Sequence, residues 1–220
     1  MTHMATSDTT RPGLILPHAF YARPARHVAV DLLGKWLVRL LDGQRLAGRI
    51  VETEAYCDDS APDLACHGSR NQGRPTARTA VMFGPAGYAY VYFTYGLHWM
   101  FNIVTGREGQ ANAVLIRALE PLEGEAAMRR LRPGRARAEW TNGPAKLAQA
   151  LAIDAALNGA NLTRPGGVIW VEDAPPPPGD TICRGPRIGL GQTPEPWHSI
   201  PWRYWLADNP FVSRPGTKKG

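Results

Sequence analysis

The sequence is poor in cysteine, in lysine and in long apolar runs. Its three cysteines form no CxxC pair and its six histidines show no metal-ligand spacing, which argues against a disulfide framework and against a structural zinc site. No segment reaches the roughly 18 consecutive apolar residues of a membrane-spanning helix, and no signal peptide is recognisable. We therefore expect a protein of the reducing cytoplasm with no metal and no membrane partner.

The motifs of several common enzyme classes are also missing. There is no P-loop, no GxGxxG after a strand, no GxSxG and no HExxH. We expect no cofactor, and the chemistry that remains open is that of carboxylates beside aromatic side chains.

Carboxylates are absent from residues 64–105, a stretch that carries Arg70, Arg74 and Arg78. The whole chain has a formal net charge of +6 and a pI near 9.5, and only four of its 25 cationic residues are lysines. Arginine binds phosphates with two parallel hydrogen bonds, so this excess fits an anionic partner. A genomic base composition that favours arginine codons explains the excess of arginine equally well.

Aromatic residues gather in the middle of this acid-free stretch. Residues 88–93 alternate with period two and are rich in β-forming residues, so they predict a strand with Tyr88, Tyr90 and Tyr92 on one face. Tyr95-Gly96 predicts a turn, and residues 97–104 predict the returning strand. The predicted hairpin is either a core strand pair with tyrosines at its rim or a surface that meets phosphates and stacks bases.

The remaining pattern predicts a single domain over residues 14–213, between a disordered tail at 1–13 and a second tail at 214–220. Asp42-Gly43 is a type I′ turn signal between two strands. Helices are expected at 24–34, 121–130 and 142–153, strands at 35–41, 44–56, 112–119, 168–172 and 203–206, and a strand followed by a turn at 186–191. We expect a mixed α+β fold: a curved, largely antiparallel sheet or roll with surrounding helices and a protruding aromatic hairpin.

Two glutamates and an arginine stand out among the predicted strands. Alternation puts Glu52, Glu54 and Tyr56 on one face, and Arg117 is alone in an apolar strand. A buried arginine needs an acidic partner, so we expect it to pair with these glutamates. A carboxylate that activates a water and stabilises an oxocarbenium-like sugar suits hydrolysis of a nucleic-acid N-glycosidic bond. That reaction also needs an aromatic slot for the extruded base and a wedge for the gap.

Six segments, in order and at compatible spacing, resemble the alkyladenine (3-methyladenine) DNA glycosylase family. They are RIVETEAY (49–56), ACH (65–67), YVYFTYG (90–96), LIRALEPLEG (115–124), NGPAKLAQALAI (142–153) and PRIGLG (186–191). The resemblance implies a bacterial, monomeric, monofunctional glycosylase of base excision repair. Such an enzyme flips alkylated or deaminated purines (3-methyladenine, 7-methylguanine, hypoxanthine, ethenoadenine) from duplex DNA and leaves an abasic site.

The resemblance also implies residue roles. Glu54 matches the general base that deprotonates the water, Arg117 helps to position that water, and the backbone carbonyl of Ile188 also holds it. The base pocket corresponds to Tyr56, Ala65, His67, Tyr92 and Asn102, with Asn102 crowding the 2-amino group of guanine.

Contacts with the DNA are implied for five further residues. Tyr95 and Met82 match positions that enter the duplex. Arg74 and Arg78 match phosphate contacts; Lys146 either contacts a phosphate or caps a helix.

Two other functions stay open on the sequence. A nucleic-acid-binding module without chemistry would use the same basic aromatic face, and a nucleosidase-type hydrolase would act on RNA or free nucleosides. Glu52 is expected to be structural rather than catalytic, as a partner of Arg117. No lysine lies in the proposed catalytic segments, so no Schiff-base lyase step is expected.

Overall fold

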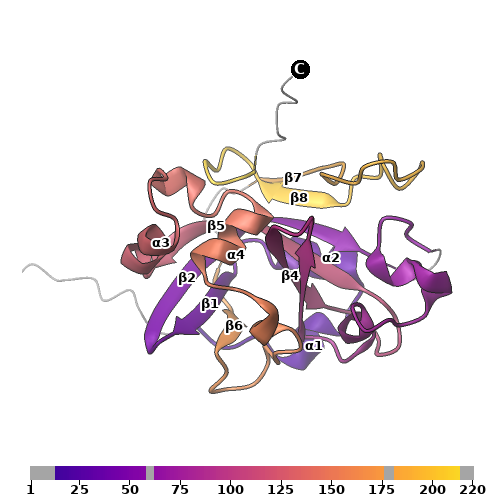
Figure 1. The fold of residues 1–220 in the computed structure, drawn as a ribbon, viewed down its shortest axis with the longest axis horizontal. Coiled ribbons are helices and arrows are strands. Elements are labelled where there is room, and N and C mark those ends of the chain that lie inside the picture. Colours follow the sequence, from indigo (N-terminus) through magenta and orange to yellow (C-terminus); the bar gives the residue numbers. More distant parts are fainter. Residues whose placement is uncertain (1–12, 58–61, 176–180, 214–220) are drawn as a thin grey trace, which may run out of the picture.

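The fold is built on an eight-stranded sheet (Figure 1). The computed structural model describes residues 13–57, 62–175 and 181–213. The order is β3-β4-β5-β2-β1-β6, with β8 paired to β2 and β7 paired to β8, and every pairing is antiparallel. The strands are β1 Trp36–Leu41, β2 Gln44–Tyr56, β3 Ala89–Thr94, β4 His98–Val104, β5 Ala113–Glu123, β6 Ile169–Glu172, β7 Ile182–Gly185 and β8 Arg203–Leu206. Apart from Gly13, both expected tails lie outside the described residues.

Short helices connect these strands and make the fold mixed α+β, as predicted. The α-helices are α1 His18–Tyr21, α2 Ala25–Asp31, α3 Glu125–Leu131 and α4 Pro144–Ala150; 3₁₀ turns lie at η1 His67–Ser69, η2 Asn71–Gly73, η3 Ala80–Phe83, η4 Arg137–Glu139 and η5 Ala155–Leu157. Helix α2 packs on β2 and β5, and α4 packs on β4 and β5. None of the helices in the described ranges is long and apolar enough to cross a membrane.

Both predicted hairpins form. Asp42 and Gly43 join β1 to β2 with φ values of 50° and 76°, and Tyr95 and Gly96 lie between β3 and β4 with φ values of 52° and 66°. Two successive positive φ values are the signature of a type I′ turn. The turn geometry leaves the side chain of Tyr95 83% exposed.

The alternation of the aromatic strand divides its residues between two cores. Tyr90 is buried in a small cluster with Cys66 and Met82, and Tyr88 and Tyr92 pack against that cluster. Ala89 and Val91, from the opposite face, belong to the main core. The strand therefore separates the main core from the region that holds the tyrosines.

The second half of β2 is covered on both edges. β5 lies along one edge and β8 along the other, and the β2–β5 register shifts around Glu52. Glu52, Thr53 and Glu54 are all fully buried. Thr53 lies on the face opposite the glutamates, as alternation predicts, and its hydroxyl donates to the carbonyl of Ala29 in α2, which packs on that face. A bulge bends a strand and re-aims its side chains, and this bulge is next to the acidic pair.

Two predicted elements differ from the structure. The helix expected from Pro121 begins only at Glu125, because β5 continues through Pro121 to Glu123. Pro121 faces Gly48 beside a register shift, and irregular pairing tolerates a residue without an amide donor. Of the strand and turn expected at 186–191, the strand is absent: these residues form a loop in which Gly189 and Gly191 have positive φ, and β7 ends before it.

Candidate active site

A cavity of about 530 Å³ opens where the aromatic hairpin, η1, β5 and the loop after β7 meet. Its lining combines aromatic, apolar and basic side chains. The lining residues are Tyr56, Ala65, His67, Arg70, Arg78, Met82, Tyr90, Tyr92, Thr94, Tyr95, Met100, Asn102, Ala113, Leu115, Arg117, Pro144, Ile188, Gly189, Leu190 and Thr193. Ten of the thirteen residues expected at a site from the sequence are in this lining; Glu54, Arg74 and Lys146 are not.

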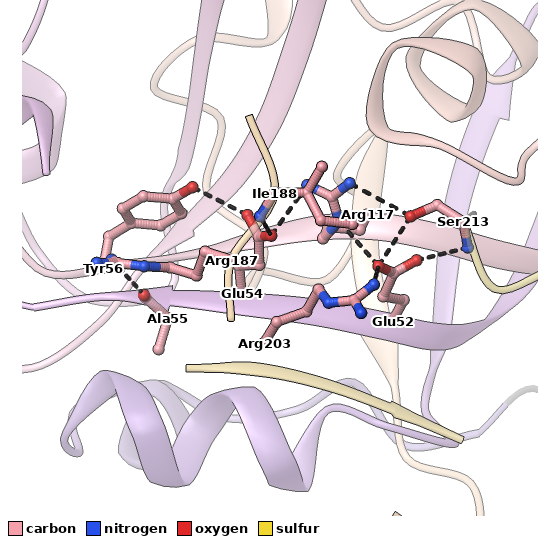
Figure 2. A network of polar contacts seen from close by, with 9 residues as sticks. All are labelled: Glu52, Glu54, Ala55, Tyr56, Arg117, Arg187, Ile188, Arg203 and Ser213. Atoms are coloured by element: carbon pink, nitrogen blue, oxygen red, sulfur yellow. Dashed lines mark hydrogen bonds and ion pairs between the residues drawn. The ribbon is translucent and has the colours of Figure 1, made fainter. Parts of the chain in front are cut away.

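Glu54 lies directly behind three of the lining residues (Figure 2). Its Oε2 accepts a hydrogen bond of 2.9 Å from the hydroxyl of Tyr56, and its Oε1 accepts one of 2.7 Å from the amide of Ile188. Arg117 Nη1 is 3.1 Å from the same Oε1. The side chain is fully buried, so these three groups fix the carboxylate just behind the cavity lining.

Arg117 shares its guanidinium between the two glutamates, as the sequence predicts. Its Nε donates to Glu52 Oε1 at 2.9 Å, while Nη1 faces Glu54. Burial by itself lowers the pKa of Arg117, but the negative charges of Glu54 and Glu52 outweigh that effect and raise the pKa above its usual value. Arg117 therefore stays a cation next to Glu54.

Tyr56, His67 and Tyr92 form an aromatic group at the cavity. The rings of His67 and Tyr92 are 4.5 Å apart between centroids, and His67 Nδ1 is 3.0 Å from the hydroxyl of Tyr90. Burial, with smaller effects from Arg70 and Arg78, lowers the pKa of His67 to about 4. His67 is therefore a neutral imidazole at physiological pH.

Burial and the charge of Glu54 raise the pKa of Tyr56 well above its usual value, and the pKa of Tyr92 rises to about 12 for the same two reasons. Both phenols therefore keep their protons, which allows Tyr56 to act as the hydrogen-bond donor to Glu54.

Two residues expected at the site have defined partners inside the protein. Asn102 is 4% exposed and donates from Nδ2 to the carbonyl of Tyr90 at 3.0 Å. Met82 is only 2% exposed and is part of the small core cluster. A buried position does not suit insertion into a duplex, so the expectation that Met82 enters DNA is corrected here: it forms part of the cavity wall.

The basic residues differ in their surroundings. Arg70 and Arg78 line the cavity, and Arg78 donates to the carbonyl of Phe93 and lies 5.2 Å from the ring centroid of Tyr92. Arg74 is exposed and outside the lining. Lys146 donates to the side chain of Asn142 at 2.7 Å, one helical turn back.

The sequence did not predict the buried pair of Asp63 and Arg187 beside Tyr56. Arg187 bonds to both carboxylate oxygens of Asp63 at 2.5 and 2.9 Å and lies 4.7 Å from the ring centroid of Tyr56. The partners are 124 residues apart in the chain, and no local pattern announces such a contact. Within the described ranges, no group of three or more His, Cys, Asp or Glu side chains is arranged to hold a metal ion.

Known proteins are similar to this sequence over most of its length. The sequence model of a family described as methylpurine-DNA glycosylase (MPG) matches residues 19–210. A relative from Carboxydothermus hydrogenoformans is 47% identical over 201 residues, which cover 91% of this chain and 100% of the relative. Relatives from Myxococcus xanthus and Methanocella arvoryzae are 46% and 47% identical and cover 93% and 91% of this chain and 97% and 96% of their own lengths. All three bear the name "Putative 3-methyladenine DNA glycosylase". This chain belongs to the methylpurine-DNA glycosylase family, whose members are hydrolases of N-glycosyl bonds in DNA.

Proposed function

We propose that the chain is a monofunctional glycosylase that flips an alkylated or deaminated purine from duplex DNA into the cavity and releases it with a water activated by Glu54. The observation that carries the proposal is the fixed Glu54 carboxylate, which contacts the lining residues Tyr56, Arg117 and Ile188. The enzyme acts as a monomer in the cytoplasm, on 3-methyladenine, 7-methylguanine, hypoxanthine and ethenoadenine.

Glu54 is suited to the role of general base because its oxygens keep acceptor capacity. Oε2 accepts one hydrogen bond, from Tyr56, whereas Oε1 accepts from the amide of Ile188 and also lies 3.1 Å from Arg117 Nη1. A carboxylate oxygen has two lone pairs, so Oε2 keeps one for a water. A water molecule bound in the cavity can therefore donate a proton to Glu54 and attack C1′ of the flipped nucleotide. The negative charge of Glu54 also stabilises the oxocarbenium-like transition state.

Arg117 supports this step in two ways. It places a positive charge 3.1 Å from Glu54 Oε1, and its place in the lining allows it to orient the water and the neighbouring phosphate. Ile188 donates its amide to Glu54, and we assign its carbonyl to the same water.

The aromatic lining provides the slot for the base. A purine stacked among Tyr56, His67 and Tyr92 gains stacking energy, and a cationic alkylpurine gains further cation–π attraction. Because His67 is neutral, it adds no positive charge that would repel such a base. Asn102, held by the carbonyl of Tyr90, crowds the 2-amino group of guanine, and the backbone near Ala65 contacts the edge of the base.

The exposed Tyr95 fills the gap that the flipped nucleotide leaves in the duplex. Arg70 and Arg78 at the cavity, together with Arg74 and Lys146, contact the phosphates, which makes binding salt-dependent. No lysine is among the cavity-lining residues of the described ranges, in keeping with simple hydrolysis and no Schiff-base step.

The test is single-turnover release of hypoxanthine from a duplex by the wild type and by Glu54→Gln. Loss of the base should slow release by about 10²- to 10⁴-fold with little change in DNA affinity. Glu172→Gln is the matched control, because Glu172 is also a buried carboxylate paired with an arginine, Arg45. If wild type and Glu54→Gln release the base at equal rates while both bind DNA, the protein is a binding module and the proposal fails. Release of the base from inosine or RNA but not from duplex DNA indicates a nucleosidase.

The same reaction tests for a lyase step. The product strand should stay intact until it is treated with alkali, and strand cleavage before that treatment would contradict the proposed hydrolysis.

A further inference from the structure

Glu52 accepts four hydrogen bonds close to Glu54 (Figure 2), although it is not in the cavity lining. Its Oε1 accepts from Arg117 Nε at 2.9 Å, from Arg203 Nη1 at 3.0 Å and from the hydroxyl of Ser213 at 2.8 Å. Its Oε2 accepts from the amide of Ser213 at 2.7 Å. Four donors on one fully buried carboxylate leave it no capacity to move.

This arrangement fixes how Arg117 meets Glu54. The Nε of Arg117 is bound to Glu52 and its Nη2 donates to the hydroxyl of Ser213 at 3.3 Å. Only Nη1 is turned to Glu54. An arginine that is free to rotate forms two parallel hydrogen bonds with a carboxylate, which would occupy the lone pairs that a water needs on Glu54.

Charge is balanced around the two glutamates as well. Glu52 faces Arg117 from β5 and Arg203 from β8. Glu54 faces Arg117, Tyr56 on its own strand, Tyr92 on β3, and Arg187 after β7. Arg187 is itself neutralised by Asp63. The positive charge that acts on Glu54 therefore comes from Arg117, and the negative charge of Glu52 partly offsets it.

We propose that Glu52, anchored by Arg203 and Ser213, is a positioning residue that acts through Arg117. It keeps Arg117 from clamping Glu54 and so preserves Glu54 as a base for the water. This inference rests on the proposed function of Glu54. It also assigns a role to residues 203 and 213, which lie outside the six short segments quoted for the resemblance.

The experiment compares pH–rate profiles for release of 7-methylguanine from duplex DNA under single-turnover conditions with saturating enzyme. The lesion is already cationic, so no protonation of the leaving base complicates the acidic limb. Glu52→Gln removes a negative charge beside Arg117 and should move the acidic limb to lower pH by about one unit, with a plateau rate at least 10-fold lower. Arg203→Met removes a positive charge and should move the limb to higher pH.

Two further variants separate this role from a structural one. Ser213→Ala removes hydrogen bonds but no charge, so it should lower the plateau without moving the limb. Glu172→Gln removes another buried carboxylate of the same sheet and should destabilise the protein while leaving the limb in place. If Glu52→Gln fails to fold, the proposal is tested by Arg203→Met, which should move the limb, against Ser213→Ala, which should not; an unmoved limb in Arg203→Met then overturns it.

The proposal is overturned if the acidic limb stays in place in both charge variants, or moves in the same direction in both. Failure of the proposed function looks different, because Glu54→Gln then keeps the wild-type rate at every pH or the wild type shows no acidic limb.

Discussion

Asp63 and Arg187 form an ion pair in which neither side chain is exposed to solvent. Asp63 also accepts from the amide of Ala65, and Arg187 precedes Ile188, whose amide donates to Glu54. The pair therefore joins the loop that carries one wall of the cavity to the loop that holds the proposed base.

Asp63→Ala should lower the free energy of unfolding by about 3–5 kcal/mol, because it leaves the charge of Arg187 buried without a partner. Asp31→Ala is the control, since Asp31 pairs with Arg23 at the surface, with both side chains well exposed; its cost should be about 0–1 kcal/mol. Urea unfolding measures both. Equal costs in the two variants would show that the buried pair contributes no more than a surface pair.

Tyr95→Ala should slow the release of hypoxanthine while it leaves nonspecific DNA binding and its salt dependence largely intact. The reason is that Tyr95 is exposed at the hairpin turn and carries no charge, so it contributes to the flipped state rather than to phosphate binding. Leu14→Ala is a matched control because Leu14 is equally exposed, at 83%, but lies outside the cavity lining. If Tyr95→Ala releases hypoxanthine at the wild-type rate, Tyr95 is not the residue that fills the gap in the duplex.

Gly96 and Gly43 offer a test of the hairpin geometry. Both have positive φ, 66° and 76°, and a Cβ at either position meets nothing within 4 Å. Alanine at each should therefore cost a similar amount of stability, about 1 kcal/mol, through backbone strain alone. Only Gly96→Ala should also slow excision, because only that turn carries Tyr95. Thermal unfolding and single-turnover rates check the pair; slower excision by Gly43→Ala would mean that the effect comes from general destabilisation.

His67 should make the protein less stable in mild acid. Its pKa is lowered from 6.5 to about 4 in the folded protein, so between these values the unfolded chain binds a proton that the folded chain does not. The part of the free energy of unfolding that depends on a neutral His67 is fully present above pH 6.5. It is lost as the pH falls towards 4, by up to about 3 kcal/mol.

The measurement is urea unfolding from pH 7 to pH 4.5 for the wild type and for His67→Gln, which removes the titrating ring. Other groups titrate in both proteins, so the difference between the two curves isolates His67. Parallel curves would mean that His67 is not held neutral by its surroundings.

Much of the local structure followed from the sequence because it depends on neighbouring residues. Asp42-Gly43 and Tyr95-Gly96 specified their turns, and the period-two pattern of residues 88–93 specified which tyrosines face away from the main core. The isolated Arg117 in an apolar strand required an acidic partner, and both predicted partners are present. The family was also recognisable from short segments.

Tertiary structure decided what depends on contacts between distant residues. Thr53 is buried because α2 packs on its face of β2, and Glu52 is enclosed by Arg203 of β8 and by Ser213. The local sequence of β2 encodes neither contact. Ser213 reaches Glu52 across 161 residues of chain, and Met82 is buried because a second small core forms beneath the hairpin. The sequence by itself determined which groups can do the chemistry. Only the packing of separate strands and loops, which brings unlike charges together out of water, decided how those groups are held.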